Sequence, residues 1–305
     1  MYNCQMTDQA YIDETRRMLD KLLPADRIMT VQQDYIKSLL KSRAPQAHKG
    51  CFGHALLYAG SYGMAGAAVL SARSCMRSGV GLLTVCTPPA NNDIIQISVP
   101  EAMVIHTDDM YATSDLTRYT ALGAGPGLGK GESQSALLDK LLKNASCPTV
   151  LDADALNIIS QNNYLLDYIP IGSVITPHPV ELSRLTGMTG DRTVMTVKAI
   201  ELAQRTGITV VIKGAPSVTI SPDSSAYINT TGNVGMATGG SGDVLTGIVL
   251  ALLAQGYSAH DAAIISVFIH GYAGDIAAST LSQTAMTSAD ITTSLPKAWY
   301  NMEQL

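Results

Sequence analysis

The stretch from Asn233 to Leu245 reads N-V-G-M-A-T-G-G-S-G-D-V-L and places a carboxylate directly after a run of glycines. Glycine allows positive φ and close backbone approach, so the N–H groups of such a loop can converge on an anion. The apolar residues that follow recur at helical spacing, which predicts a helix with one buried face, and Ser241 is placed to cap its start. Free N–H groups and the positive end of the helix dipole suit phosphate. We therefore predict a phosphate cradle at Gly239–Gly242.

Asp243 falls in the first turn of this helix, beside the expected phosphate. There it suits a base that accepts the proton of an attacking hydroxyl. The alternative is that it only stabilises the helix end, which is worth roughly 0.3–1 kcal/mol. In both roles the helix dipole is expected to lower the pKa of this carboxyl group. A weak base still serves in phosphoryl transfer, where orienting the attacking oxygen matters more than basicity.

A short apolar segment, residues 148–152, predicts a buried strand that ends at Asp152, and Asp154 lies two residues further on. The carboxyl ends of parallel strands face the crevice where α/β folds bind ligands, so we expect both carboxylates there. Paired carboxylates suit Mg²⁺, held directly or through water. The alternative for Asp154 is that it caps the next helix, and the two roles are compatible.

Lys213 ends another predicted strand, residues 209–212, whose β-branched side chains indicate burial. An unpaired charge in that position would be costly, so a phosphate partner is expected. Short strands at 218–220 and 226–228 are predicted to form a hairpin after it.

His178 lies between two prolines at the end of a strand predicted over residues 173–176. Such a histidine is held stiffly, and we expect it to point into the crevice and contact a ligand, although a lone histidine is usually structural. Glu181 either completes a water or metal network or begins the next helix.

These motifs resemble the signature of the NAD(P)H-hydrate dehydratases, a branch of the ribokinase-like superfamily. The family signature reads N-P-G-M-A-T-G-G-T-G-D, whereas this chain has Val234 for the proline and Ser241 for the threonine. The serine keeps a hydroxyl, and the lost proline slightly loosens the loop entrance. Three more segments match the family: H-K-G-x-F-G at 48–53, G-P-G-L-G at 125–129 and P-H-P at 177–179, where Val180 replaces a family glycine.

The resemblance implies a metabolite-repair lyase that restores NADH or NADPH from its (S)-hydrate. A nucleotide, ADP in preference to ATP, phosphorylates the hydroxyl, and phosphate is then eliminated, leaving AMP. Asp243 is implied as the base. Implied substrate contacts are Ala67, Gly127, His178 and Asp243. Implied nucleotide contacts are Lys213, Gly214, Ala215, Pro216, Ser217, Gly239, Gly240, Ser241 and Gly242. Asp152 and Glu181 are the tentative Mg²⁺ residues. Relatives form tetramers, and many carry a separate epimerase domain, so a homotetramer and an epimerase partner are also implied.

Two other functions are compatible with part of the sequence. A kinase of a vitamin-like alcohol, such as a thiazole or hydroxymethylpyrimidine, shares the G-x-G-D element, but the three further segments favour the dehydratase. A catalytically silent nucleotide-binding or scaffold protein is disfavoured because Asp243 and the glycine loop are intact. The glycines at 60, 63 and 66 do not indicate a Rossmann site, because no acidic residue ends the following strand, residues 82–86.

Composition sets the class of protein. Charged residues make up 15% and apolar residues 46% of the 305 residues, and the net charge of −5 argues against nucleic-acid binding. The cysteines are odd in number and form no C-x-x-C, which predicts reduced thiols. They are Cys4, Cys51, Cys75, Cys86 and Cys147. No apolar run approaches the roughly 20 residues of a membrane helix, and no signal peptide is indicated, so a soluble cytoplasmic protein is expected.

Strands alternate with helices from about residue 46 to residue 305, which predicts one α/β domain with a mostly parallel sheet covered on both faces. By resemblance this domain is ribokinase-like. A largely apolar helix over residues 260–279 is expected to close it. Residues 1–45 carry basic side chains and apolar residues at helical spacing, which predicts an appendage of one or two helices.

Overall fold

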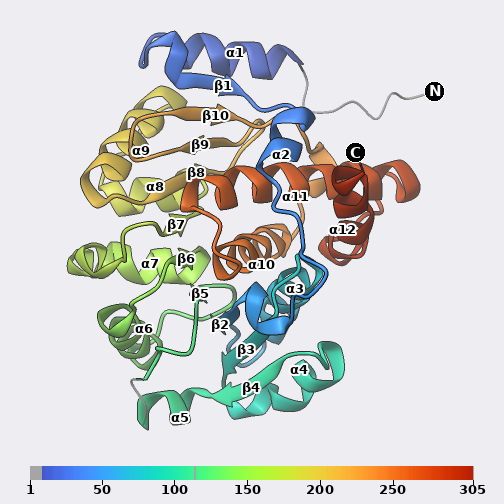
Figure 1. The fold of residues 1–305 in the computed structure, drawn as a ribbon. Helices are drawn as coiled ribbons and strands as arrows, with labels where there is room; N and C mark the ends of the chain where they lie inside the picture. The colour runs from blue at the N-terminus through green and yellow to red at the C-terminus, as the bar shows by residue number, and fades with distance from the viewer. Residues whose placement is uncertain (1–8, 113–114, 305) are drawn as a thin grey trace.

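The computed structural model describes residues 9–112 and 115–304, with only the backbone of residues 110–112. Within these residues the strands form one ten-stranded sheet with helices on both faces (Figure 1). Their order is β1-β10-β9-β8-β7-β6-β5-β2-β3-β4. The strands are β1 (Ile28–Thr30), β2 (His54–Tyr58), β3 (Leu82–Thr87), β4 (Met103–His106), β5 (Ala121–Ala124), β6 (Thr149–Leu151), β7 (Val174–Ile175), β8 (Thr209–Ile212), β9 (Val218–Ile220) and β10 (Ala226–Ile228).

The sheet is parallel except at β9, which runs antiparallel to both β8 and β10. This confirms the expected α/β class with a mostly parallel sheet. The adjacent strands β6, β7 and β8 are parallel, so the residues that follow their carboxyl ends lie side by side. Asp152 follows β6, His178 comes after β7, and Lys213 follows β8.

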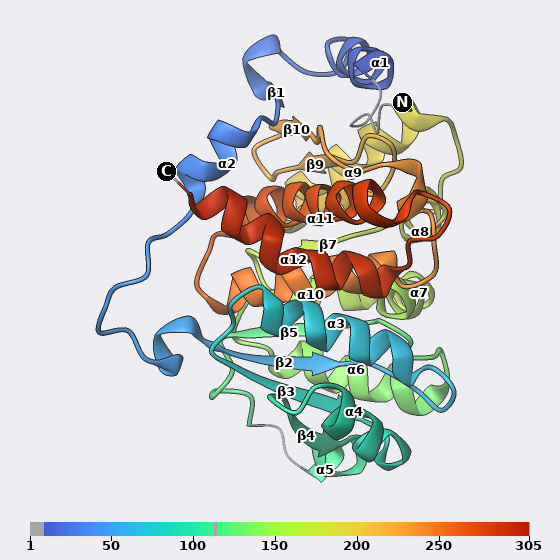
Figure 2. The same cartoon turned by 90° about the vertical axis from the view of Figure 1, so that its right-hand side faces the viewer.

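The helices alternate with the strands along the chain and cover both faces of the sheet. They are α1 (Gln9–Leu19), α2 (Gln33–Leu39), α3 (Ala65–Arg77), α4 (Asn92–Ser98), α5 (Thr107–Ala112), α6 (Glu132–Asn144), α7 (Ala153–Gln161), α8 (Pro179–Thr186), α9 (Arg192–Thr206), α10 (Ser241–Ala254), α11 (Ala259–Leu281) and α12 (Ser288–Glu303). Helices α3, α10, α11 and α12 lie over one face, as Figure 2 shows. Helices α6 to α9 cover the other. Each face of the sheet carries its own hydrophobic core. Successive residues of β2 point to opposite faces, so Leu57 packs into the core under α3 and α10 and Leu56 packs into the core under α6 to α9.

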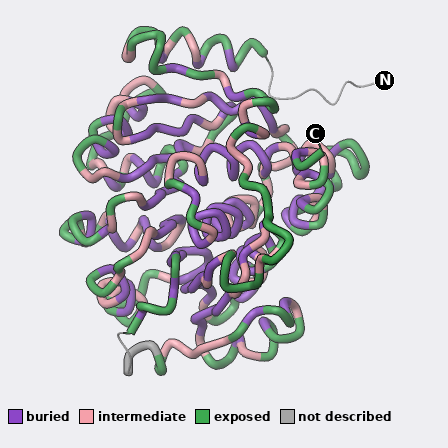
Figure 3. Tube along the Cα trace, in the orientation of Figure 1, coloured by how far each residue is buried: buried purple, intermediate pink, exposed green. Residues whose placement is uncertain are grey.

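Helix α10 is more deeply buried than its sequence suggested. We expected one buried face, but every residue from Val244 to Ala254 is buried, because α10 lies between the sheet and helices α3 and α11 (Figure 3). Gly247 permits this packing, since a Cβ there would overlap the Ser71 carbonyl and the Ser74 hydroxyl of α3. A helix that is apolar all round is a core helix.

The N-terminal segment holds the two expected helices, α1 and α2, and also a strand that was not expected. Strand β1 pairs in parallel with β10 and so extends the sheet. The division of the chain between residues 45 and 46 stays a prediction. At the other end, the helix over residues 260–279 does not close the domain, because α12 follows and packs on α11 and α3.

Helix α11 corrects the expectation that no apolar run nears the length of a membrane span. It has 23 residues and passes by length and composition, although 72% of its most apolar window is buried inside the fold. Its burial against α10 and α12 is that of a core helix.

The cysteines of the described residues are free thiols. Burial raises the pKa of Cys86 to about 12 and raises that of Cys75 further. These thiols are therefore held in the unreactive protonated form. Cys4 lies outside the described residues.

Candidate functional site

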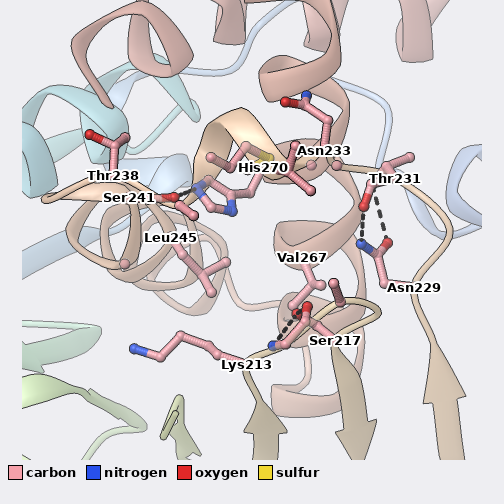
Figure 4. A pocket seen from close by; sticks show the side chains of 18 of the residues that line it. Lys213, Ser217, Asn229, Thr231, Asn233, Thr238, Ser241, Leu245, Val267 and His270 are labelled. Carbon is pink, nitrogen blue, oxygen red and sulfur yellow. Dashed lines mark hydrogen bonds between the residues drawn. The ribbon is translucent and has the colours of Figure 1, made fainter. Parts of the chain in front are cut away.

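A cavity of about 940 Å³ lies beside the carboxyl ends of the strands, between the loops after β8 and β10 and the helices α10 and α11. Figure 4 shows Lys213 and Ser241 on one side of it and Asn229 and Thr231 on the opposite side. Six of the predicted nucleotide residues line the cavity: Lys213, Gly214, Ala215, Ser217, Ser241 and Gly242. Pro216, Gly239 and Gly240 are not among the lining residues.

The start of α10 faces this cavity. Gly240 is the N-cap residue and has φ +91°, and a Cβ there would overlap Leu70, so the position requires glycine. The prediction that Ser241 caps the helix is wrong, since Ser241 is the first helical residue and makes no capping bond. Its Oγ lies 3.3 Å from His270 Nε2 instead. The first N–H groups of a helix lack intrahelical partners, so this end can bind an anion.

The entrance to the glycine loop is held by Asp275 of α11. Its carboxylate accepts hydrogen bonds of 2.9 Å from the Gly232 amide and from Asn233 Nδ2, and Asn233 Oδ1 in turn accepts from the Gly235 amide at 3.0 Å. Burial raises the pKa of Asp275. This role of Asp275 was not predicted, because its only signal in the sequence is a carboxylate inside an apolar helix.

Lys213 pairs with the two predicted metal residues. Its Nζ lies 2.6 Å from Asp152 Oδ1 and 3.9 Å from Glu181 Oε2. Thr246 Oγ1 donates a hydrogen bond of 2.9 Å to the other oxygen of Asp152, which is 1% exposed. A Cβ built on Gly242 would lie 3.3 Å from the lysine Nζ, so the lysine reaches the start of α10. The predicted cradle, the lysine and the acidic pair thus form one cluster.

This cluster fits Mg²⁺ poorly as a set of direct ligands. Both oxygens of Asp152 face Lys213 and Thr246, and Glu181 Oε2 accepts a 2.9 Å hydrogen bond from the His178 amide. Glu181 Oε1 lies 3.4 Å from His178 Nε2. A Mg²⁺ ion commonly keeps several waters and binds substrate phosphates, so the through-water alternative suits this arrangement better.

The pKa of Asp243 is raised, so the prediction that it is lowered is wrong. Burial and the nearby charge of Asp152 raise the pKa of Asp243 to about 7, against a smaller lowering by Lys213 and a further rise from Asp154. The helix dipole was expected to dominate, but the loss of solvent outweighs it. A carboxyl group that titrates near pH 7 suits a general base.

His178 has both a structural role and a place in the cavity wall. It caps α8, with Nδ1 accepting from the Val180 amide at 3.1 Å and the Glu181 amide at 3.4 Å. Glu181 completes a capping box. An accepting Nδ1 puts the proton of the neutral ring on Nε2. The His178 side chain is 47% exposed and lines the cavity.

Ala67 and Gly127 touch each other outside this cavity. Gly127 has φ +56°, and a Cβ there would lie 2.8 Å from the Ala67 Cβ. Asp154 does not take the N-cap position of α7, which belongs to Asp152; its Oδ2 accepts from the Gly129 amide at 2.9 Å and so holds the Gly127 loop. This corrects the capping alternative.

The backbone at Asp243 contacts helix α3 on one side and adjoins Lys213 on the other. One turn after Ala67, the Ser71 hydroxyl of α3 donates a 2.9 Å hydrogen bond to the Asp243 carbonyl. On the other side, Gly242 adjoins Lys213. The backbone of the expected base therefore lies between helix α3, which carries Ala67, and Lys213, while Asp243 itself is not among the lining residues of the cavity.

Arg192 was missed by the sequence analysis. Its guanidinium donates to the carbonyls of Ala215, at 3.4 Å, and Pro216. Ser217 closes the same loop by donating to the Gly214 carbonyl at 3.1 Å. An arginine at the start of α9 thus fixes the loop that lines the cavity, and nothing in the local sequence of α9 signals this contact.

The sequence matches a protein family and a curated relative of that family. Residues 55–297 match the family model described as NAD(P)H-hydrate dehydratase. The chain is 36% identical over 288 residues to the bifunctional NAD(P)H-hydrate repair enzyme Nnr of Moorella thermoacetica, covering 88% of this chain and 53% of that protein. It therefore spans about half the length of that relative.

Solved structures show the same fold. A ribokinase-like superfamily protein from Enterococcus faecalis has a TM-score of 0.82 and 26% identity, covering 93% of this chain and 99% of its own. The ADP/ATP-dependent NAD(P)H-hydrate dehydratase of Bacillus subtilis, co-crystallised with ATP and Mg²⁺, has a TM-score of 0.78 and 31% identity, covering 90% and 99%. The expected ribokinase-like fold is thus confirmed, and the chain belongs to the NAD(P)H-hydrate dehydratase family.

Proposed function

We propose that this protein is a nucleotide-dependent lyase that restores NADH and NADPH from their (S)-hydrates. The observation that carries the proposal is Asp243, a carboxyl group with a pKa of about 7 that directly follows the cavity-lining Gly242 and whose carbonyl is bonded to Ser71 of the helix that carries Ala67. A base with that pKa is about half ionised at neutral pH, so it can accept a proton and later return it. The name of the Bacillus subtilis relative supports the same activity.

The chemistry begins at the hydroxyl of the hydrated nicotinamide ring. Asp243 accepts the hydroxyl proton while the oxygen attacks the terminal phosphorus of ADP, and AMP leaves. The C–O bond of the resulting phosphate ester then breaks with its electron pair leaving on phosphate, and the neighbouring ring carbon gives its proton to the departing phosphate as the C–C double bond forms. Phosphate is a far better leaving group than hydroxide, which explains why a dehydratase would use a nucleotide.

Lys213 and the start of α10 are assigned to the terminal phosphate. The lysine is held by Asp152 and reaches Gly242, so its charge is already oriented before the nucleotide binds. A fixed positive charge stabilises the negative charge that phosphoryl transfer spreads over the phosphate oxygens. Mg²⁺ would add charge neutralisation at these oxygens, with Asp152 and Glu181 reached through water.

ADP is the proposed co-substrate, with ATP as the alternative that the relative's name also allows. We propose a cytoplasmic homotetramer and an epimerase partner that supplies the (S)-hydrate. The oligomeric state is tested by light scattering of the purified protein.

The activity is tested by incubating NADH hydrate with the protein and Mg²⁺, with ADP and ATP side by side. We expect the absorbance of NADH to recover, and chromatography to show AMP and phosphate in amounts equal to the NADH formed. Intact ADP after complete recovery would rule out the phosphorylation route. The kinase alternative predicts phosphorylation of a thiazole or hydroxymethylpyrimidine alcohol with no NADH recovery, and the family membership disfavours it.

A further inference from the structure

Helix α1 of the N-terminal segment reaches the cavity, although no motif of the sequence analysis assigned it a role there. Tyr11 of α1 is one of the lining residues and is 55% exposed. Among the lining residues of the described chain, Tyr11 alone is a tyrosine, phenylalanine or tryptophan. An aromatic ring on the wall of a ligand cavity offers a flat apolar face, which few other side chains provide.

Helix α1 is held to the rest of the fold, so the backbone that carries the Tyr11 ring is fixed in place. Ile12, Thr15 and Leu19 are buried against the sheet. Arg16 donates from Nη1 to the carbonyl of Ile28 in β1 at 3.3 Å. Met18 Sδ lies 4.0 Å from the Thr196 hydroxyl of α9.

One turn of α1 also faces the loop that lines the cavity. Glu14 lies three residues after Tyr11 and so on the same side of the helix. Burial lowers the pKa of Arg192, and the charge of the Glu14 carboxylate opposes that shift. Arg192 in turn holds the carbonyls of Ala215 and Pro216. Helix α1 is thus connected to the predicted nucleotide loop as well as lining the cavity.

The position of α1 selects the part of the nucleotide that it meets. Lys213 and Ser241, the first residue of α10, lie at one side of the cavity, and Asn229 lies at the opposite side (Figure 4). Asn229 directly follows β10, and α1 packs on β10. A nucleotide whose phosphates lie at Lys213 therefore extends its base toward the side on which α1 packs.

We propose that the purine of the bound nucleotide stacks on the ring of Tyr11, which makes α1 the base-binding wall of the site. The inference rests on the proposed nucleotide-dependent function and extends it to a residue outside the family motifs. Stacking accepts any base with a flat face, so Tyr11 contributes affinity for the base and leaves the choice between purines to other groups.

The test separates base binding from phosphate binding. ADP and pyrophosphate, each with Mg²⁺, are titrated by calorimetry into the wild type, Tyr11→Ala, Tyr11→Phe and Tyr300→Ala. Tyr300 is the matched control, because it is also 55% exposed but lies on α12 and is not a lining residue. We expect ADP to bind about tenfold more weakly to Tyr11→Ala and within twofold of wild type to the other two variants. Pyrophosphate is expected to bind all four proteins alike.

Tyr11→Trp gives an independent measurement. The wild-type chain has one tryptophan, Trp299 of α12, so emission that changes only in the variant reports on position 11. ADP should quench that emission and pyrophosphate should not. The inference is overturned if Tyr11→Ala binds ADP as the wild type does, if it loses ADP and pyrophosphate equally, or if ADP leaves the Tyr11→Trp emission unchanged. A wild type that binds no ADP would instead overturn the proposed function.

Discussion

Lys213 and Asp152 form a partly buried ion pair, Nζ to Oδ1 at 2.6 Å, that joins the residue after β8 to the residue after β6. From the sequence, the two residues are predicted to act separately, the lysine on phosphate and the aspartate on a metal. In the structure the two residues form a single unit. The Asp152 carboxylate, 1% exposed, holds the Lys213 ammonium group beside Gly242, where phosphate is proposed to bind. A lysine fixed in this way loses less side-chain entropy when the nucleotide arrives.

Lys213→Met is expected to weaken ADP binding about ten- to a hundredfold, because a charge-assisted contact to phosphate is worth roughly 1.5–3 kcal/mol. Binding of the reduced dinucleotide should change less. The variant should also be less stable, because it leaves the Asp152 charge buried without its partner. Calorimetry and thermal unfolding measure the two effects.

The double variant Lys213→Met with Asp152→Asn separates the loss of ADP affinity from the loss of stability. Removing the unpaired charge should restore much of the stability without restoring ADP affinity. Unchanged ADP affinity in both variants would mean that the lysine only supports the fold.

The pH dependence of kcat is expected to follow Asp243. With a pKa of about 7, this group is ionised above pH 7 and protonated below it, so kcat should fall as the pH drops through 7. Asp152→Asn removes a negative charge that raises this pKa, so the acidic limb should move to lower pH. An acidic limb in the same place in this variant would show that another group sets it.

Arg192→Ala is expected to raise the KM for ADP severalfold, because the Ala215 and Pro216 carbonyls lose the guanidinium that holds their loop. The KM for the hydrate should stay near its wild-type value, since the loop lies on the cavity side of Asp243. Arg205→Ala is the matched control, an exposed arginine on the same helix. Equal changes in both KM values would indicate general destabilisation.

The strands that end in turn-forming residues were predicted well. The expected bounds of β8, β9 and β10 are the observed ones, because glycine, proline and aspartate mark the turns between short runs of β-branched and apolar residues. The unexpected strand β1 has three residues and is defined by pairing with β10, far away in sequence, which leaves no local signal. The unexpected helix α12 contains Pro296 and several serines and threonines, which weaken a helical pattern.

Individual residues of the site were predicted from the sequence, but the contacts between them were not. Glycine and lysine motifs indicated phosphate, and the structure places Lys213 beside Gly242. The pKa of Asp243 could not be predicted, because its causes are burial and the charge of Asp152, a neighbour only in the fold. Asp275 and Arg192 act by holding loops from distant helices, so their roles follow from tertiary contacts alone.

Asp243→Asn tests the base directly. The amide keeps the shape of the carboxylate but cannot accept the hydroxyl proton, so kcat should fall about 10²–10⁴-fold while ADP affinity stays near that of the wild type. Burial raises the pKa of Asp243 from 3.8 to about 7, so between these values the folded state holds a proton that the unfolded state has lost. The free energy of unfolding of the wild type therefore decreases as pH rises through this window, and the full penalty is present above it.

The Asn variant lacks that penalty and should be more stable than the wild type at pH 8, by about 1–3 kcal/mol, with the difference disappearing toward pH 4. A base and a helix cap make opposite predictions here. A cap would cost stability when replaced and leave most of kcat intact. Thermal unfolding at pH 4 and pH 8, together with kcat, distinguishes the two roles. An Asn variant that is less stable at pH 8 and keeps more than a tenth of kcat would assign the proton to another group, whereas Asp243→Glu should recover part of the activity only if the carboxylate is the base.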